Sequence, residues 1–214
     1  MEESDKKILK GTTTIGLVCK DGIVMAADMR ATAGNLIVNK ETDKVHSITD
    51  NIVITMAGTV SDAQLLTKHI RAELSLMRIR NQHEATVKEA ANLLAGFVYG
   101  NIRKMSMIPG VAHFIMGGKD RTGFYLYDIF ADGSLTEEKK YVTSGSGSVF
   151  AIGVLETMFK DGLSINEGVD LAVKALNAAL QRDTYTGNGI NVITITKNGV
   201  KREIQKFINT GIKS

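Results

Sequence analysis

A threonine that follows a glycine near the beginning of the chain stands in a setting that can activate a hydroxyl nucleophile. Residues 10–17 read Lys-Gly-Thr-Thr-Thr-Ile-Gly-Leu, so a short charged leader ends at Gly11 and an apolar strand follows. Cleavage of the bond between Gly11 and Thr12 would leave Thr12 with a free α-amine beside its own hydroxyl. One residue would then hold both nucleophile and base, which is a known way to activate threonine.

The residues before Thr12 are predicted to be a pro-segment that is removed on maturation. Residues 1–11 contain three acidic and three basic side chains and one apolar pair, Ile8-Leu9, so they lack the apolar centre of a secretory signal. Taken alone, such a leader is more often a frayed terminus. The sequence after Gly11 favours processing, and residues 12–214 are then predicted to form a single catalytic domain.

Further candidate residues lie in two polar runs within apolar surroundings. Residues 26–32 read Ala-Ala-Asp-Met-Arg-Ala-Thr and contain Asp28. Residues 181–189 read Gln-Arg-Asp-Thr-Tyr-Thr-Gly-Asn-Gly and contain Asp183. Each run alone is typical of a loop with solvated charges, and Lys44 alone is typical of a surface lysine. Only their combination points to a site.

Other chemistries fit the sequence less well. A dinucleotide fingerprint beginning at Gly145 would need glycine where Phe150 stands, and no Gly-Lys-Ser/Thr sequence occurs. The four histidines form no paired metal motif and are expected to be structural, and the single cysteine, Cys19, has no partner. A Ser–His–Asp triad stays open because its members can lie far apart along a chain, but no G-x-S-x-G elbow marks one. We expect no metal and no cofactor.

The composition is that of an ordinary globular domain. Of the 214 residues, 43% are hydrophobic and 23% are charged, which is enough apolar material for one sizeable core. The formal net charge is +3 without a Lys/Arg block, so nucleic acid is not indicated as a partner. No apolar run approaches the ~20 residues of a membrane span. One cysteine fits a reducing compartment, and we expect a cytoplasmic protein.

The predicted elements come as helix pairs between strand hairpins. Strands are expected at residues 13–19, 23–27, 45–48, 52–57, 111–117, 123–130, 190–196 and 202–207. Helices are expected from a capping box at Ser61, over 84–105 before the only proline, Pro109, over 146–159, and from a capping box at Ser164 to about Arg182. A doubly wound parallel sheet would alternate single strands and helices. The order instead favours an α+β fold, a four-layer αββα sandwich of two antiparallel sheets flanked by helix pairs.

Taken together, these segments resemble the beta subunits of the proteasome core particle, a family of N-terminal-nucleophile hydrolases, from Thr12 nearly to the C-terminus. The motifs that carry the resemblance are Thr-Thr-Thr-Ile-Gly at 12–16, Ala-Ala-Asp-Met-Arg-Ala-Thr at 26–32, Met-Ala-Gly-Thr at 56–59, Gly-Ser-Gly at 145–147 and Arg-Asp-x-x-Thr-Gly at 182–187. The family often has serine where Thr186 stands.

The resemblance implies a role for each site residue. Thr12 would be the nucleophile, and Lys44 with Asp28 would form the ion pair beside it. Ser146 and Asp183 would hold the Thr12 amine and a water. Gly11 would stand at the processing point, and Gly58 would be the oxyanion donor. The first specificity pocket would be lined by Ala31, Met56 and Val60. The backbone of Thr32 and Gly58 would pair with an extended peptide.

The resemblance also implies an assembly. Family members form inner seven-membered beta rings between outer alpha rings, so the expected partners are beta subunits, alpha subunits and, indirectly, an unfolding ATPase. The expected activity is threonine endopeptidase on unfolded proteins, with cleavage after hydrophobic residues. Two alternatives remain: a non-catalytic ring subunit, and an N-terminal-nucleophile amidohydrolase that acts on a small amide.

Overall fold

The computed structural model describes residues 11–107 and 109–208, and within them two five-stranded antiparallel sheets lie face to face. The first sheet has the strand order β10-β1-β2-β11-β12 and the second the order β5-β6-β7-β8-β9. The first sheet comprises β1 (Thr14–Cys19), β2 (Gly22–Asp28), β10 (Tyr141–Ser144), β11 (Gly189–Thr196) and β12 (Gly199–Phe207). The second comprises β5 (Val45–Ser47), β6 (Ile52–Gly58), β7 (Ala112–Lys119), β8 (Phe124–Ile129) and β9 (Leu135–Glu138).

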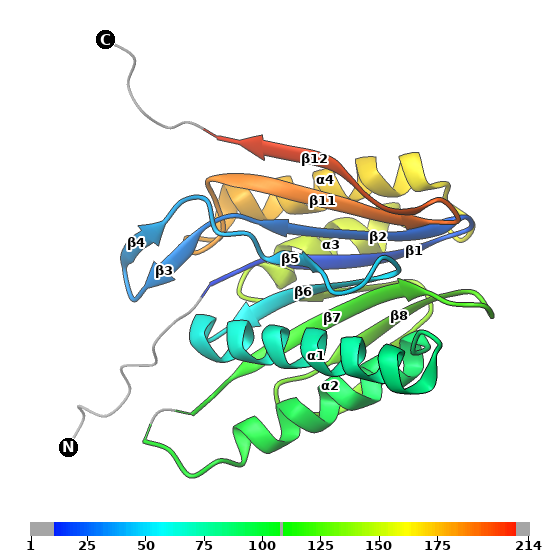
Figure 1. Cartoon of the computed structure of the whole chain (residues 1–214). Helices are drawn as coiled ribbons and strands as arrows, with labels where there is room; N and C mark the ends of the chain where they lie inside the picture. Colours follow the sequence, from blue (N-terminus) through cyan, green and yellow to red (C-terminus); the bar gives the residue numbers. More distant parts are fainter. Residues whose placement is uncertain (1–10, 108, 209–214) are drawn as a thin grey trace.

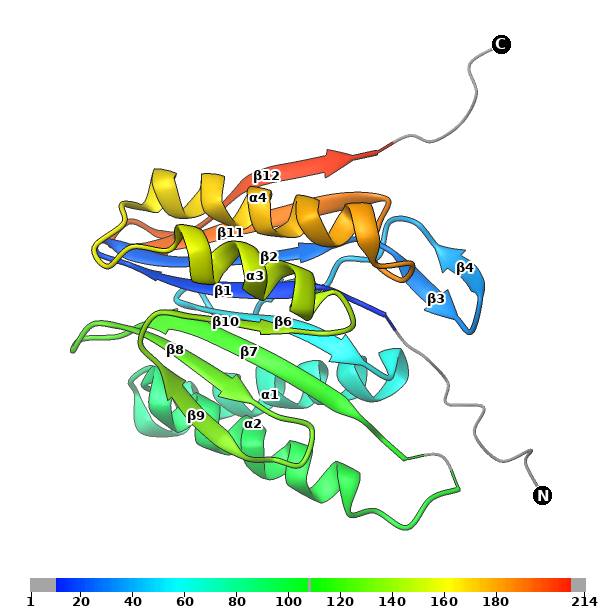
Figure 2. The ribbon, with the colours of Figure 1, turned by 180° about the vertical axis from the view of Figure 1, so that it is seen from behind.

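Helix pairs cover the outer faces of the two sheets, as Figures 1 and 2 show from opposite sides. The pair α3 (Ser148–Met158) and α4 (Ile165–Arg182) packs on the first sheet, and the pair α1 (Val60–Asn81) and α2 (Val87–Ile102) packs on the second. A small hairpin of β3 (Ala31–Ala33) and β4 (Leu36–Asn39) projects beside the sandwich. The predicted four-layer αββα sandwich is therefore confirmed.

Three apolar layers hold the sandwich together, and β2 shows how the sequence builds them. Val24 and Ala26 of β2 face the helices α3 and α4, whereas Ile23, Met25 and Ala27 face the second sheet. The whole strand is buried, because it is a central strand with protein on both faces. Glycines let the sheets approach: a Cβ at Gly16 would lie 2.7 Å from Leu126 Cδ1 of the opposite sheet.

The structure corrects the predicted start of α1. The expected capping box at Ser61 is wrong, because α1 begins at Val60 after the N-cap residue Thr59 and has no side-chain cap. The Thr59 carbonyl already accepts the Ala63 N–H, while the Thr59 N–H donates to the Val111 carbonyl of the neighbouring chain segment. That contact fixes the extended backbone from which the helix starts.

The second and third helices are shorter than predicted. Thr86 and Glu89 form a capping box that starts α2 at Val87, and α2 ends at Ile102, well before Pro109. Helix α3 begins at Ser148, because the preceding residues form a turn in which Gly145 has a φ of +94°. The predicted capping box at Ser164 is present and opens α4, which ends at Arg182.

Four short strands were not predicted: β3, β4, β9 and β10. They contain three or four residues each, too few for a clear alternation of polar and apolar side chains. Among the described residues, no helix is long and apolar enough to cross a membrane.

Candidate active site

Thr12 lies at the end of the first sheet where β1 begins. Strand β1 pairs with β2 so that Thr14 stands opposite Ala27, which brings Thr12 and Thr13 beside Asp28. The Thr13 N–H donates to Asp28 Oδ1 at 3.0 Å, and the Asp28 N–H donates to the Thr13 carbonyl at 3.1 Å. These two bonds fix the chain that carries Thr12, whose side chain is buried.

A buried ion pair stands beside this chain end. Lys44 Nζ lies 2.7 Å from Asp28 Oδ1, and the two side chains are 4% and 0% exposed. The Asp28 carboxylate also accepts the backbone N–H groups of Arg30 and Gly187, both on Oδ2 at 3.0 Å. With Thr13, three backbone donors and one ammonium surround the carboxylate, so both of its oxygens have partners.

Burial lowers the pKa of Lys44 from its ordinary value of 10.5, while the charge of Asp28 and the hydrogen bond to it act in the opposite direction. Asp183 also favours the charged form, and Arg30 opposes it. The amine therefore titrates closer to neutrality than a surface lysine does.

A second polar network links the loop before α3 to the end of α4. Ser146 Oγ donates to Asp183 Oδ2 at 2.6 Å, and Thr186 Oγ1 donates to the same oxygen. Thr186 Oγ1 also lies 2.6 Å from Thr13 Oγ1. Ser146 and Asp183, predicted from far apart in the sequence, are thus hydrogen-bonded to each other and joined through Thr186 to the residue after Thr12.

Gly58 ends β6 on the opposite sheet and faces the same space. Its φ of +109° suits only glycine, and a Cβ there would lie 2.3 Å from the Val111 carbonyl oxygen. Helix α1 starts two residues later, so its positive N-terminal end opens beside Gly58.

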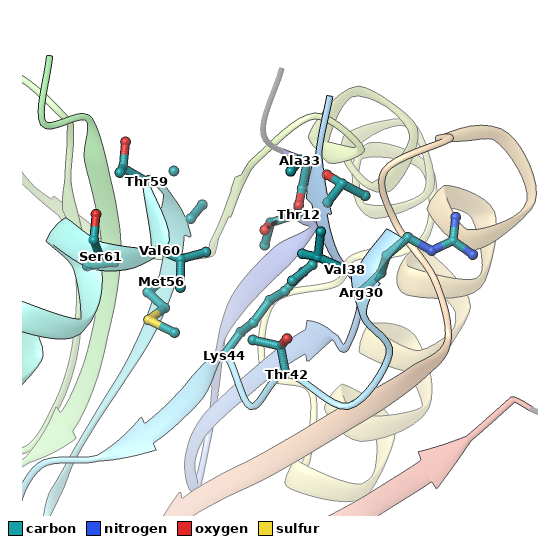
Figure 3. Close-up of a pocket in the computed structure, with 16 residues that line it drawn as sticks. Thr12, Arg30, Ala33, Val38, Thr42, Lys44, Met56, Thr59, Val60 and Ser61 are labelled. Atoms are coloured by element: carbon teal, nitrogen blue, oxygen red, sulfur yellow. Dashed lines mark hydrogen bonds between the residues drawn. The ribbon is translucent and has the colours of Figure 1, made fainter. Parts of the chain in front are cut away.

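Thr12, Lys44 and Gly58 line one pocket of about 280 Å³. Figure 3 shows the Lys44 side chain directed toward Thr12 and the Arg30 guanidinium turned away. The guanidinium is held by Asn188 and by the Thr184 carbonyl. The predicted substrate-binding residues Ala31, Thr32, Met56 and Val60 all line this pocket, with Met56 and Val60 on the wall across from Thr12.

Sequence reasoning missed several lining residues, namely Ala33, Val38, Thr42, Ala57, Thr59, Ser61 and Ala63. Val38 belongs to the hairpin β3–β4, which was not predicted, so no sequence signal could have placed it there. Ser61 and Ala63 lie in the first turn of α1, whose N-cap is Thr59 and not the predicted Ser61, so the sequence did not place them in the pocket.

The Gly11 carbonyl lies next to the hydroxyl of the candidate nucleophile. Thr12 Oγ1 donates a hydrogen bond of 2.7 Å to the Gly11 carbonyl oxygen. Gly11 itself packs on Tyr185, since a Cβ on Gly11 would lie 1.5 Å from Tyr185 Cβ and 2.8 Å from its Cα. The predicted pro-segment residues 1–10 lie outside the described residues. No group of three or more potential metal ligands occurs among the residues that the structure describes.

The two facing sheets between helix pairs define the class: this is the fold of the N-terminal-nucleophile hydrolases. A family model described as "Proteasome subunit" matches residues 8–195, and the chain belongs to the proteasome subunit family.

Curated relatives from archaea match nearly the whole chain. The proteasome subunit beta of Methanothermobacter thermautotrophicus is 42% identical over 210 residues, which cover 96% of this chain and 98% of that protein. The proteasome subunit beta 1 of Thermococcus gammatolerans is 45% identical over 200 residues, covering 94% and 96%. The proteasome subunit beta of Methanococcus aeolicus is 43% identical over 209 residues, covering 95% and 94%. The resemblance to archaeal beta subunits is therefore confirmed.

Proposed function

We propose that this chain is a catalytic beta subunit of a proteasome core particle and acts as a threonine endopeptidase. The observation that carries the proposal is the position of the Thr12 hydroxyl. It lies against the Gly11 carbonyl, in a pocket that also holds Lys44, which is paired with buried Asp28. The similarity to proteins named proteasome subunit beta supports it independently.

Maturation would begin with self-cleavage. Thr12 Oγ attacks the Gly11 carbonyl carbon, the amide C–N bond breaks, and an ester links Gly11 to the Thr12 oxygen. Water then hydrolyses the ester, which releases the Gly11 carboxylate and leaves Thr12 with a free amine and a free hydroxyl. The contact of Gly11 with Tyr185 would hold the leader in place for this step.

Peptide hydrolysis would use the same hydroxyl with the new amine as general base. An α-amine has a pKa of about 7.7–8.0, close to working pH, so it can take the hydroxyl proton and pass it to the leaving amine. Lys44 as a cation would lower the pKa of both Thr12 groups, and Asp28 would keep the ammonium in place.

Gly58 and the Ser146–Asp183 pair would complete the site. The Gly58 N–H would stabilise the negative charge that develops on the substrate oxygen. Ser146 and Asp183 would orient the Thr12 amine and the water that hydrolyses the acyl ester.

The pocket supports a preference for hydrophobic residues before the cleaved bond. Ala31, Met56 and Val60 line it with apolar groups, and burying an unpaired charge against them would be costly. The backbone of Thr32 and Gly58 would pair with an extended peptide as an added strand.

The subunit is proposed to work within cytoplasmic particles built of beta and alpha rings, fed with unfolded protein by an ATPase. Helix α3 carries the exposed apolar residues Val149, Ile152 and Met158, which are 67%, 40% and 43% exposed and which contacts between subunits would bury.

The test compares assembled particles of wild type and Thr12→Ala on a fluorogenic peptide with leucine before the reporter and on an unstructured protein. Wild type should hydrolyse both, and Thr12→Ala neither. Particles that hydrolyse only a small amide would instead indicate an amidohydrolase. Equal rates for wild type and Thr12→Ala would refute Thr12 as the nucleophile.

A further inference from the structure

A serine, a histidine and an aspartate form a hydrogen-bonded chain between the two sheets, outside the site described above. His113 Nε2 lies 2.5 Å from Asp128 Oδ1, and His113 Nδ1 lies 2.7 Å from Ser144 Oγ. His113 and Asp128 belong to β7 and β8 of the second sheet, whereas Ser144 ends β10 of the first sheet. The chain of contacts therefore ties one sheet to the other.

For a neutral imidazole, the two partners of His113 determine which ring nitrogen carries the proton. A carboxylate can only accept, so His113 Nε2–H donates to Asp128. In the neutral imidazole Nδ1 is then the acceptor for the Ser144 hydroxyl proton. The order is that of a hydrolytic triad, but Ser144 is only 3% exposed, so a substrate does not reach its oxygen. Phe130 packs edge-on against the imidazole, with ring centroids 4.8 Å apart.

On the side of the first sheet, the hydrogen bonds of His113 lead through Ser144 to the backbone around Thr12. Ser144 stands opposite Thr14 across the β1–β10 pair. The next residue, Gly145, packs so closely that a Cβ on it would lie 1.9 Å from the Thr12 carbonyl oxygen. The Gly147 N–H donates to that same oxygen at 3.4 Å. The turn that follows Ser144 therefore sets the position of Thr12.

On the side of the second sheet, His113 belongs to β7, the strand that pairs with β6 next to Gly58. Across the β6–β7 pair, Ala112 stands opposite Gly58 and His113 opposite Ala57. The carbonyl of Val111, the residue before Ala112, accepts the Thr59 N–H at 2.7 Å. The segment around Gly58 is therefore held by Val111 and Ala112, which lie two residues and one residue before His113.

We propose that His113 is a positioning residue that sets the distance between Thr12 and Gly58, through Ser144 on one side and β7 on the other. The inference rests on the proposed function, because it assigns Thr12 and Gly58 to nucleophile and oxyanion donor. These two groups lie on different sheets, and His113 bonds directly across the gap between the sheets near both. A misplacement of about 1 Å at a reacting centre can slow a reaction about 100-fold, so a fixed spacing has a catalytic consequence.

The test uses assembled particles whose Thr12 amine has been shown by mass to be free. His113→Leu removes both hydrogen bonds and should lower kcat at least about tenfold while KM for a leucine peptide stays within about twofold. His113→Gln places an acceptor and a donor as far apart as the ring nitrogens and should restore kcat to within about threefold of wild type. Ser144→Ala breaks one link and should lower kcat in the same direction.

The matched control is Ile195→Ala, in the apolar layer between the same sheets. Ile195 pairs with Ile23 at the end of β2 opposite to Asp28. It should lower the Tm without changing kcat, which separates positioning from general destabilisation.

The outcomes separate failure of the inference on His113 from failure of the proposed function. Wild-type kcat in His113→Leu, or in Ser144→Ala where His113→Leu does not assemble, would overturn the inference. So would an equal loss in Ile195→Ala, or a glutamine variant as slow as the leucine variant. If wild type and Thr12→Ala hydrolyse the peptide equally, the proposed function fails instead.

Discussion

Replacing Lys44 and replacing Asp28 should destabilise the protein unequally, although the two residues form one ion pair. Lys44 Nζ makes one hydrogen bond of 2.7 Å to Asp28 Oδ1. Asp28 accepts that bond and three more from the backbone N–H groups of Thr13, Arg30 and Gly187. Removing the lysine leaves the carboxylate with three donors, whereas removing the aspartate leaves an ammonium and three amides without their acceptor.

The magnitudes follow from this count. Lys44→Met leaves the buried Asp28 carboxylate without its cation, which costs on the order of 3–5 kcal/mol, but its three backbone donors remain. Asp28→Ala leaves a buried charge without its partner, which costs about 3–5 kcal/mol, and each orphaned amide adds about 1–3 kcal/mol. In Asp28→Ala, loss of the Lys44 proton would limit the cost of the unpaired charge, but the three backbone N–H groups would still lack an acceptor. Asp28→Ala should therefore cost at least about 2 kcal/mol more than Lys44→Met.

Urea unfolding of the isolated subunit, followed by circular dichroism, measures the difference. The control is Lys201→Met, which breaks the exposed pair with Glu203 at 2.8 Å and should change the free energy of unfolding by less than about 1 kcal/mol. Equal losses for Lys44→Met and Asp28→Ala, or a larger loss for Lys44→Met, would refute the view that backbone donors hold Asp28.

Three further predictions concern processing, specificity and pH. Gly11→Ala should block removal of the leader, because its Cβ would collide with Tyr185; intact mass after assembly checks this, and a chain that still begins at residue 12 would contradict it. Peptides with Leu or Tyr before the reporter should be cleaved faster than peptides with Arg or Glu, since Met56 and its neighbours offer no charge partner; faster cleavage of a charged peptide would overturn the pocket assignment. The pKa of Lys44 is lowered from 10.5, so the ammonium loses its proton at a pH below 10.5. On the alkaline side, kcat/KM should therefore fall before pH 10.5 is reached. A profile that stays flat up to pH 10.5 would show that the cation is not needed.

The regular elements of the fold could be predicted where the sequence contains both an alternating pattern and a boundary signal. Strands β1 and β2 have an apolar pattern around Lys20-Asp21-Gly22, and α4 has its capping box at Ser164. The start of α1 could not be predicted, because Thr59 is held by Val111, a contact between residues far apart in sequence. Strand β9 reads Leu-Thr-Glu-Glu and becomes a strand by pairing with β8 rather than by its own preference.

The candidate site could be predicted as a set of residues but not as a set of contacts. The motifs around Thr12, Asp28 and Asp183 carried the resemblance, and the fold brings these segments together. The bond between Ser144 and His113 joins strands that no motif links, and the hairpin that brings Val38 to the pocket is too short to show a pattern. Such contacts depend on the packing of one sheet on the other, which periodicity does not specify.

The claim that Thr12 is a self-exposed nucleophile is tested most directly by the N-terminus of the subunit in assembled particles. Wild-type and Thr12→Ala subunits are each mixed with alpha subunits, and the beta chain is measured by intact mass spectrometry. The wild-type chain should begin at Thr12, and the variant chain should keep residues 1–11. A variant chain that begins at residue 12, or a wild-type chain that keeps its leader in particles that hydrolyse peptides, would contradict it.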